Sequence, residues 1–313
     1  MNQHLERLWV GLTDSEGFRR LATRGPGAGL LRSGAYRRLN MLRRYALSAY
    51  RARAAPELFQ QVRSFCLFVG HNKSGASMAS ALLDAHPEAA FADEEDALQY
   101  VAAGFRREQI FHLMLWGARR EALKGRVTAR RLTPYSYRVP GQWQGRHRAL
   151  RALGDSTTGT TTRRLAQDPG LLDRLEALMG GVEVKLIQVV RNPYDPISVM
   201  MVRGRRSFAN AIEHYFAHCG ALAELRRRLG PERLHTVRYE AFVRSPAPTL
   251  AVLCRFLALE PEEGYLRDCA SILRAAPDSH RHMVPWGPRE IGEVRERMAR
   301  YDFLRGYSFE GDG

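Results

Sequence analysis

Lysine is scarce in this chain of 313 residues, which contains only Lys73, Lys124 and Lys185, so arginine carries almost all of the formal net charge of +15. The four cysteines show no CxxC spacing, which excludes a small disulfide-stabilised domain and predicts reduced thiols in a core. No apolar run approaches the roughly 18 residues of a membrane span, and the first residues lack the apolar stretch of a signal peptide. We therefore expect a soluble, cytoplasmic protein.

The composition favours one large hydrophobic core, since 45% of the residues are hydrophobic and the length suits a single α/β domain with an appended segment. We divide the chain into a basic helical N-terminal extension, 1–60, and an α/β domain, 61–313. The arginine excess is compatible with a polyanionic small ligand, acidic lipid or nucleic acid. Because a GC-rich genome also enriches arginine, the charge alone does not predict nucleic-acid binding, which we consider unlikely.

The N-terminal extension contains one amphipathic pattern, Tyr36–Arg53, with apolar residues every three or four positions and arginines beside them. Such a helix usually packs its apolar stripe on the domain, which is the interpretation that we favour. The alternative is a basic helix that lies on a membrane or a partner.

The segment Phe65–Ala92 has the pattern of a strand, an anion-binding loop and a helix. The apolar run Phe65–Val69 leads into the polar loop His71–Gly75, after which apolar residues return at helical spacing. The first N–H groups of such a helix attract a phosphate, and a glycine lets the backbone come close to it. The candidate anion-binding residues are Lys73, Ser74, Gly75, Ala76 and Ser77.

A second strand and helix junction lies in Val184–Val202. The apolar strand Leu186–Val190 ends at Arg191, and Pro193 suits the first turn of the next helix. A guanidinium at this point matches the geometry of a phosphate better than an ammonium does.

Other segments complete an alternating α/β order. We expect strands at Ala89–Ala92, His147–Asp155 and Leu234–Arg238, and a basic, aromatic insertion at Arg119–Gln144 that lines the substrate site. The spacing of His214 and His218 suggests a metal pair, but no third ligand stands at a recognisable spacing, so we predict no metal.

These motifs together resemble a known family. A Walker A loop is unlikely because Lys73 precedes Gly75. The K-S-G-x-[TS] order, followed by Leu82–Pro87, instead resembles the 5′-phosphosulfate loop of sulfotransferases that use 3′-phosphoadenosine 5′-phosphosulfate, PAPS. Residues 191–195 resemble the R-[ND]-P-x-[DE] motif for the 3′-phosphate, and Arg238–Ala241 resembles the R-Y-E-[DA] segment whose tyrosine lies by the adenine. In relatives, a basic loop closes over the nucleotide at the place that Arg281 occupies here.

The resemblance implies a P-loop-like sulfotransferase fold, a mainly parallel sheet of about five strands flanked by helices. It implies sulfuryl transfer from PAPS to a hydroxyl or amine of a small-molecule acceptor, with no metal. By similarity to tyrosylprotein sulfotransferases, Glu94 is the general base. We expect Lys73 to neutralise charge on the bridging phosphate oxygen and Tyr239 to lie by the adenine.

Three positions depart from the family pattern. Ala76 replaces a threonine, Ser156 replaces a lysine, and Val199 stands where a serine is expected, with Ser198 one position early. We expect Ser198 to compensate for Val199. These departures keep a second interpretation open, a catalytically degenerate nucleotide- or anion-binding accessory protein. The sequence identifies neither the acceptor nor the oligomeric state.

Overall fold

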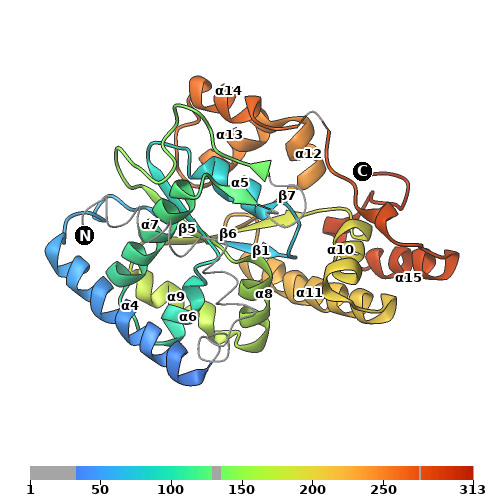
Figure 1. The fold of residues 1–313 in the computed structure, drawn as a ribbon, viewed down its shortest axis with the longest axis horizontal. Coiled ribbons are helices and arrows are strands. Elements are labelled where there is room, and N and C mark those ends of the chain that lie inside the picture. Colours follow the sequence, from blue (N-terminus) through green and yellow to red (C-terminus); the bar gives the residue numbers. More distant parts are fainter. Residues whose placement is uncertain (1–32, 129–134, 275, 313) are drawn as a thin grey trace.

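The computed structural model describes residues 33–128, 135–274 and 276–312. Its centre is a five-stranded sheet in which every neighbouring pair is parallel, with the strand order β2-β5-β1-β6-β7 (Figure 1). This confirms the predicted fold class. The strands are β1 (Ser64–Gly70), β2 (Ala89–Asp93), β5 (Ala152–Ser156), β6 (Glu183–Val190) and β7 (Leu234–Arg238).

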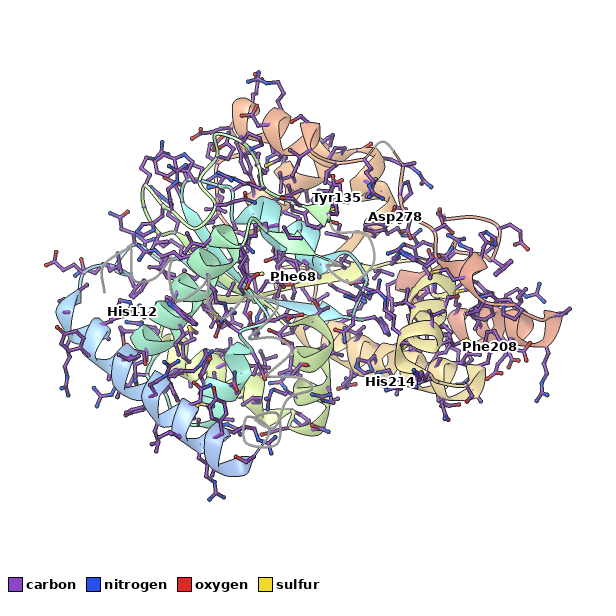
Figure 2. All side chains as sticks on the ribbon, in the orientation of Figure 1. Phe68, His112, Tyr135, Phe208, His214 and Asp278 are labelled. Atoms are coloured by element: carbon purple, nitrogen blue, oxygen red, sulfur yellow. The ribbon has the colours of Figure 1, made fainter. Side chains whose placement is uncertain are left out.

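Helices cover both faces of the sheet, which explains why the strands read as continuous apolar runs. Alternate residues of β1 point to opposite faces: Phe65 and Leu67 join one core cluster, and Cys66 and Phe68 join the other. Figure 2 shows Phe68 near the centre of the molecule. The first cluster includes α6 (Ala97–Ala102), α7 (Arg107–Leu123), α8 (Thr158–Gln167), α9 (Gly170–Met179) and α11 (Phe208–Leu229). The second includes α5 (Ala76–Leu83), α12 (Tyr239–Arg244), α13 (Pro246–Phe256) and α14 (Glu263–Ser271).

Smaller elements surround the carboxyl ends of the strands. Helix α10 (Tyr194–Gly204) follows β6. Two short strands of two residues each, β3 (Val127–Thr128) and β4 (Tyr135–Ser136), form a separate antiparallel pair. The chain ends with η1 (Arg281–Met283), α15 (Pro288–Met298) and η2 (Asp302–Leu304). The predicted insertion is partly helix, because α7 continues to Leu123, and residues 129–134 lie outside the described residues.

The predicted N-terminal helix is α4 (Gly34–Ala54), and it packs against α7. Ser48 is buried in this contact, where the Gln109 amide donates to its hydroxyl at 3.2 Å and to the Tyr45 carbonyl at 3.0 Å. The prediction that this helix packs on the domain is therefore correct for one side of the helix. Residues 1–32 of the extension lie outside the described residues.

Two further expectations can be compared with the structure. All four cysteines are buried and none forms a disulfide, and burial raises the pKa of the Cys254 thiol to about 12. Within the described ranges, none of the helices has both the length and the apolar character needed to cross a membrane.

Candidate active site

A cleft of about 850 Å³ opens at the carboxyl ends of the central strands. Its walls come from the loops that follow β1, β2, β5 and β6 and from the segment between α14 and η1. Parallel α/β sheets bind ligands at this edge, because the loops and helix N-termini converge there. The cleft therefore unites segments that are far apart in the sequence.

The loop after β1 has the shape of an anion-binding loop. Lys73 and Gly75 take left-handed backbone conformations, with φ of 69° and 99°, and α5 begins at Gly75 without a side-chain cap. The Lys73 side chain is exposed at the cleft, and the buried Ser74 hydroxyl has no hydrogen-bond partner. A Cβ atom at Gly75 would lie 2.4 Å from Cδ2 of Tyr239, so only glycine lets this loop pack on the tyrosine ring.

Arg191 joins this loop to the opposite wall of the cleft. The buried guanidinium donates to the Lys73 carbonyl at 3.2 Å and to Nδ1 of His280 at 2.8 Å, and it lies 4.5 Å from the centre of the Tyr239 ring. Its Nε is buried without a hydrogen-bond partner, 3.6 Å from the Asp195 carboxylate. The residues predicted for the two ends of a nucleotide, Lys73 and Arg191, therefore share one cavity with Tyr239.

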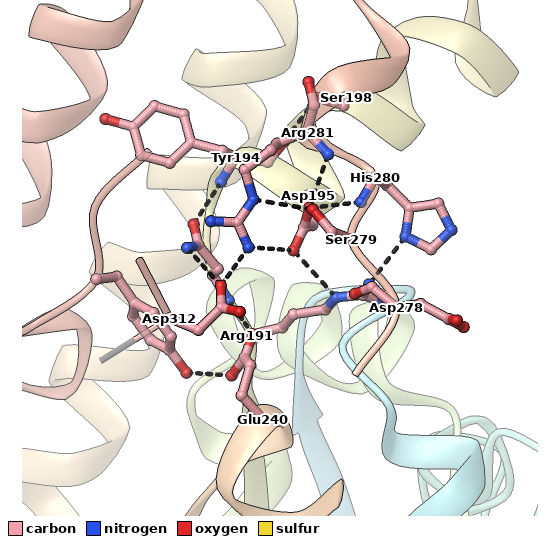
Figure 3. Close-up of polar contacts among 12 residues, drawn as sticks. Arg191, Tyr194, Asp195, Ser198, Glu240, Asp278, Ser279, His280, Arg281 and Asp312 are labelled. Atoms are coloured by element: carbon pink, nitrogen blue, oxygen red, sulfur yellow. Dashed lines mark hydrogen bonds and ion pairs between the residues drawn. The ribbon is translucent and has the colours of Figure 1, made fainter. Parts of the chain in front are cut away.

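Asp195 fixes the segment that covers Arg191. Its carboxylate accepts hydrogen bonds from the backbone N–H groups of His280 at 2.7 Å and Arg281 at 2.8 Å, and it pairs with the Arg281 guanidinium at 3.3 Å (Figure 3). Asp312 pairs with the same guanidinium from the other side. Arg281 is buried by these two carboxylates and does not line the cleft; its neighbour His280 does.

Ser198 is also directed away from the cleft. Its hydroxyl donates to the Tyr194 carbonyl at 2.7 Å and accepts a hydrogen bond from Nε1 of Trp286 at 3.0 Å. Val199 lines the cavity instead, since successive helical residues lie about 100° apart around the axis. One helical turn beyond Val199, Arg203 reaches the same wall, a residue that the sequence analysis did not single out.

The acidic run after β2 separates into side chains with different surroundings. Glu94 is exposed at the cleft, with a left-handed φ of 61°. Glu95 is buried and paired with Arg44 at 2.5 Å and Arg120 at 2.7 Å. Asp96 pairs with Arg164 at 2.5 Å. Of these three carboxylates, Glu94 is the one available to a ligand in the cleft.

Asp93 and Asp155 are two further acidic residues that the sequence analysis left without a role. Asp93 lines the cleft and accepts a hydrogen bond from the Ser77 hydroxyl at 3.3 Å, and burial raises its pKa to about 7. Asp155 accepts hydrogen bonds from the N–H groups of Glu95 at 3.2 Å and Ala97 at 2.9 Å, and burial raises its pKa to about 7. Asp155 thus positions the loop that presents Glu94.

The segment predicted to line the substrate site does reach the cleft, where Tyr135 and Tyr137 form part of its wall. Two further residues of the wall, Arg274 and Asp278, were not identified from the sequence. Arg274 lies 4.9 Å from the centre of the Tyr135 ring and pairs with Asp278 at 2.8 Å. Figure 2 shows Tyr135 and Asp278 on the same side of the sheet. The positions of Arg274 and Asp278, in the segment after α14, are defined only by the tertiary structure.

The possible metal ligands have other partners. His214 and His218 lie one turn apart on α11, and in the described ranges they belong to no group of three ligands. The acidic group Asp195, Glu240 and Asp312 has ligand atoms within 4.8 Å of one another, but Arg281 pairs with two of these carboxylates. The third, Glu240, accepts hydrogen bonds from the Tyr307 hydroxyl and the Asn192 N–H.

The chain has similarity to known proteins in structure and in sequence. Solved structures that it resembles include the sulfotransferase domain of the Synechococcus PCC 7002 olefin synthase (19% identity, 77% of this chain and 96% of that one, TM-score 0.46). A second is a sulfotransferase from Alicyclobacillus acidocaldarius (16% identity, 78% of this chain and 96% of that one, TM-score 0.45). A third is mouse sulfotransferase SULT7A1 complexed with PAP (14% identity, 79% of this chain and 85% of that one, TM-score 0.41). No curated protein sequence matches the chain. The sequence model of the sulfotransferase family matches residues 67–263, which is more than half of the chain. The chain therefore belongs to the sulfotransferase family.

Proposed function

We propose that this protein transfers a sulfuryl group from PAPS to a hydroxyl or amine of a small-molecule acceptor. The observation that carries this proposal is the single cleft that joins the Lys73 loop, Arg191 and the exposed carboxylate of Glu94. Two anion-binding groups fit a nucleotide with phosphates at both ends, and a carboxylate in the same cleft suits proton abstraction. Four buried reduced thiols support a reducing compartment, which we take to be the cytoplasm.

The residues of the cleft fit such a donor. The uncapped start of α5 supplies N–H donors for a 5′-phosphate. The Ser74 hydroxyl in the same loop has no partner, but it is buried and does not line the cleft. Arg191 supplies a charged donor for a 3′-phosphate, and we propose that Arg203 serves there in place of the hydroxyl that Val199 lacks. The Tyr239 ring packs on Gly75 and Arg191 and lines the cleft, and we propose that the adenine lies beside it there.

The transfer that we propose is direct and in line. The oxygen or nitrogen of the acceptor forms a bond to sulfur while the bond from sulfur to the bridging phosphate oxygen breaks. Glu94 takes the proton that this oxygen or nitrogen loses. The bonding electrons leave with 3′-phosphoadenosine 5′-phosphate, PAP. Lys73 and the loop N–H groups stabilise the negative charge that grows on that oxygen.

A catalytically degenerate accessory protein is the second candidate. Ala76 and Val199 place methyl groups where the family pattern has hydroxyls, and both line the cleft. Ser156 is buried and its hydroxyl has no partner, so it supplies no positive charge where relatives carry a lysine. Such a protein would bind PAP and transfer nothing.

Calorimetry with PAP, adenosine 5′-phosphate and ATP tests the ligand. Because a charge-assisted contact contributes roughly 1.5–3 kcal/mol, Arg191→Ala should weaken PAP binding about tenfold to a hundredfold and change adenosine 5′-phosphate binding little. Arg267→Ala is the matched control, since Arg267 is exposed on α14 and outside the cleft. Equal affinity for ATP and PAP would show that the assignment of Arg191 is wrong.

Transfer from labelled PAPS to acceptors in a cell extract then separates the two candidates. We expect transfer by the unaltered chain and a loss of transfer in Lys73→Met, which also weakens nucleotide binding. Tight PAP binding without any transfer would favour the accessory protein.

A further inference from the structure

Helix α4 exposes an unusual concentration of large apolar side chains. In the described residues, six of the ten exposed large hydrophobic side chains lie on this helix: Tyr36, Leu39, Leu42, Tyr45, Leu47 and Tyr50. Leu39 is 66% exposed, Leu42 67% and Tyr50 72%. Single exposed leucines are ordinary, but a cluster on one helix marks an interaction surface.

The contact with α7 does not account for this surface. Ser48, Met41 and Arg44 face the domain, and Arg44 pairs with the buried Glu95. Leu39 lies on the opposite side of α4, and Leu42 and Leu47 lie on its two flanks, as the 100° step between residues requires. Figure 1 shows α4 at the margin of the molecule, and one of its sides is free of the other helices in the described ranges.

The charge of α4 indicates what this side contacts. The helix contains six arginines and no aspartate or glutamate. Arg38 and Arg53 are exposed beside the apolar residues. A second copy of the helix would bring arginines together, which opposes self-association. Anionic lipid headgroups attract arginine, leucine enters the acyl region, and tyrosine prefers the interface between them.

We propose that α4 lies on the surface of an anionic membrane. Leu39, Leu42 and Leu47 enter the boundary between headgroups and acyl chains, while Arg38 and Arg53 contact the headgroup phosphates. The other side of the helix stays packed on α7, so the protein binds the membrane as a folded unit. The proposal does not depend on the reaction at the cleft.

Sedimentation of the full chain with lipid vesicles tests this proposal. One vesicle population contains phosphatidylcholine with about a third phosphatidylglycerol, and the other contains phosphatidylcholine alone. We expect binding to the anionic vesicles, about tenfold weaker for each of Leu39→Ser and Leu47→Ser, and about fivefold weaker for each of Arg38→Gln and Arg53→Gln. The midpoint of thermal unfolding should not change, because these side chains are exposed.

Val252→Ser and Arg267→Gln are the matched controls, since both residues are exposed on α13 and α14, which cover the other face of the sheet. These variants should bind like the unaltered chain. Three results would overturn the proposal. The first is unchanged binding in the leucine variants. The second is a loss of vesicle binding on removal of residues 1–32, together with unchanged vesicle binding in the α4 variants of the full chain. The third is a dimer in solution that Leu39→Ser dissociates.

Discussion

Glu94 and Glu95 are neighbours in the sequence but have opposite surroundings. Glu94 is exposed at the cleft, whereas Glu95 is buried between two arginines. Glu94→Gln keeps the size of the side chain and removes its ability to accept a proton, so turnover should fall roughly 10²–10⁴-fold while PAP affinity is retained. Turnover and calorimetry on the same preparation measure both quantities.

Glu95→Gln is the informative control for that variant. It removes the negative charge between Arg44 and Arg120, so we expect a free energy of unfolding lower by about 3 kcal/mol. Glu94→Gln should leave this free energy unchanged, because its carboxylate is exposed. Unchanged turnover in Glu94→Gln together with a large loss of turnover in a stably folded Glu95→Gln would assign the base to Glu95.

We expect Asp93 to make PAP binding depend on pH. Burial raises its pKa to about 7, so the carboxyl is neutral below that pH and charged above it. A negative charge beside Ser77 repels phosphates, and PAP affinity should therefore fall roughly threefold to tenfold as the pH rises through 7. Asp93→Asn should remove this fall. If the two proteins have the same pH profile in calorimetry, another group causes it.

Arg126 lies just after the end of α7 and connects several elements of the fold. Its guanidinium pairs with the fully buried Asp84 and donates to the Phe91 carbonyl of β2 at 2.7 Å. Asp84 also accepts hydrogen bonds from the N–H groups of Phe91 at 2.8 Å and Gly145 at 3.0 Å. One ion pair thus connects α7, α5, β2 and the loop before β5.

Arg126→Met should lower the free energy of unfolding by about 3–5 kcal/mol, because it leaves the Asp84 carboxylate buried without a countercharge. Chemical denaturation measures this change. Adding Asp84→Asn to Arg126→Met should recover part of it, since the neutral side chain no longer needs a cation. An additive loss in the double variant would show that the two side chains act independently.

The sequence predicted elements best where burial on both sides of the sheet leaves a continuous apolar run. The strand Leu234–Arg238 has the bounds that we expected, and Phe65–Val69 lies within β1. The strand predicted at His147–Asp155 begins only at Ala152. The residues before it bond to the turn ahead of β2 instead, with the Arg148 N–H donating to the Pro87 carbonyl at 2.7 Å. A partner of this kind cannot be read from local periodicity.

Across the whole molecule, the candidate site depends on tertiary contacts as much as on motifs. Residues at the carboxyl ends of neighbouring parallel strands meet at one edge of a sheet. The cleft accordingly contains Lys73, Arg191 and Tyr239. Arg281 and Ser198 lie elsewhere, because Asp195 and Asp312 hold the arginine and the Tyr194 carbonyl and Trp286 hold the serine. Asp93, Arg203 and Arg274 reach the cleft without any motif that marks them.

Because the chain contains few lysines, a reagent that reacts with amines can modify the cleft selectively. Lys124 and Lys185 are largely buried and paired with Glu121 at 3.0 Å and Glu183 at 2.9 Å, whereas Lys73 is exposed at the cleft. Apart from the terminal amine, an amine-reactive reagent should therefore modify mainly one residue, since acylation requires an accessible, uncharged amine. A nucleotide bound over the loop would shield that amine. Mass spectrometry of the labelled protein would then report occupancy of the cleft directly, before any acceptor is known.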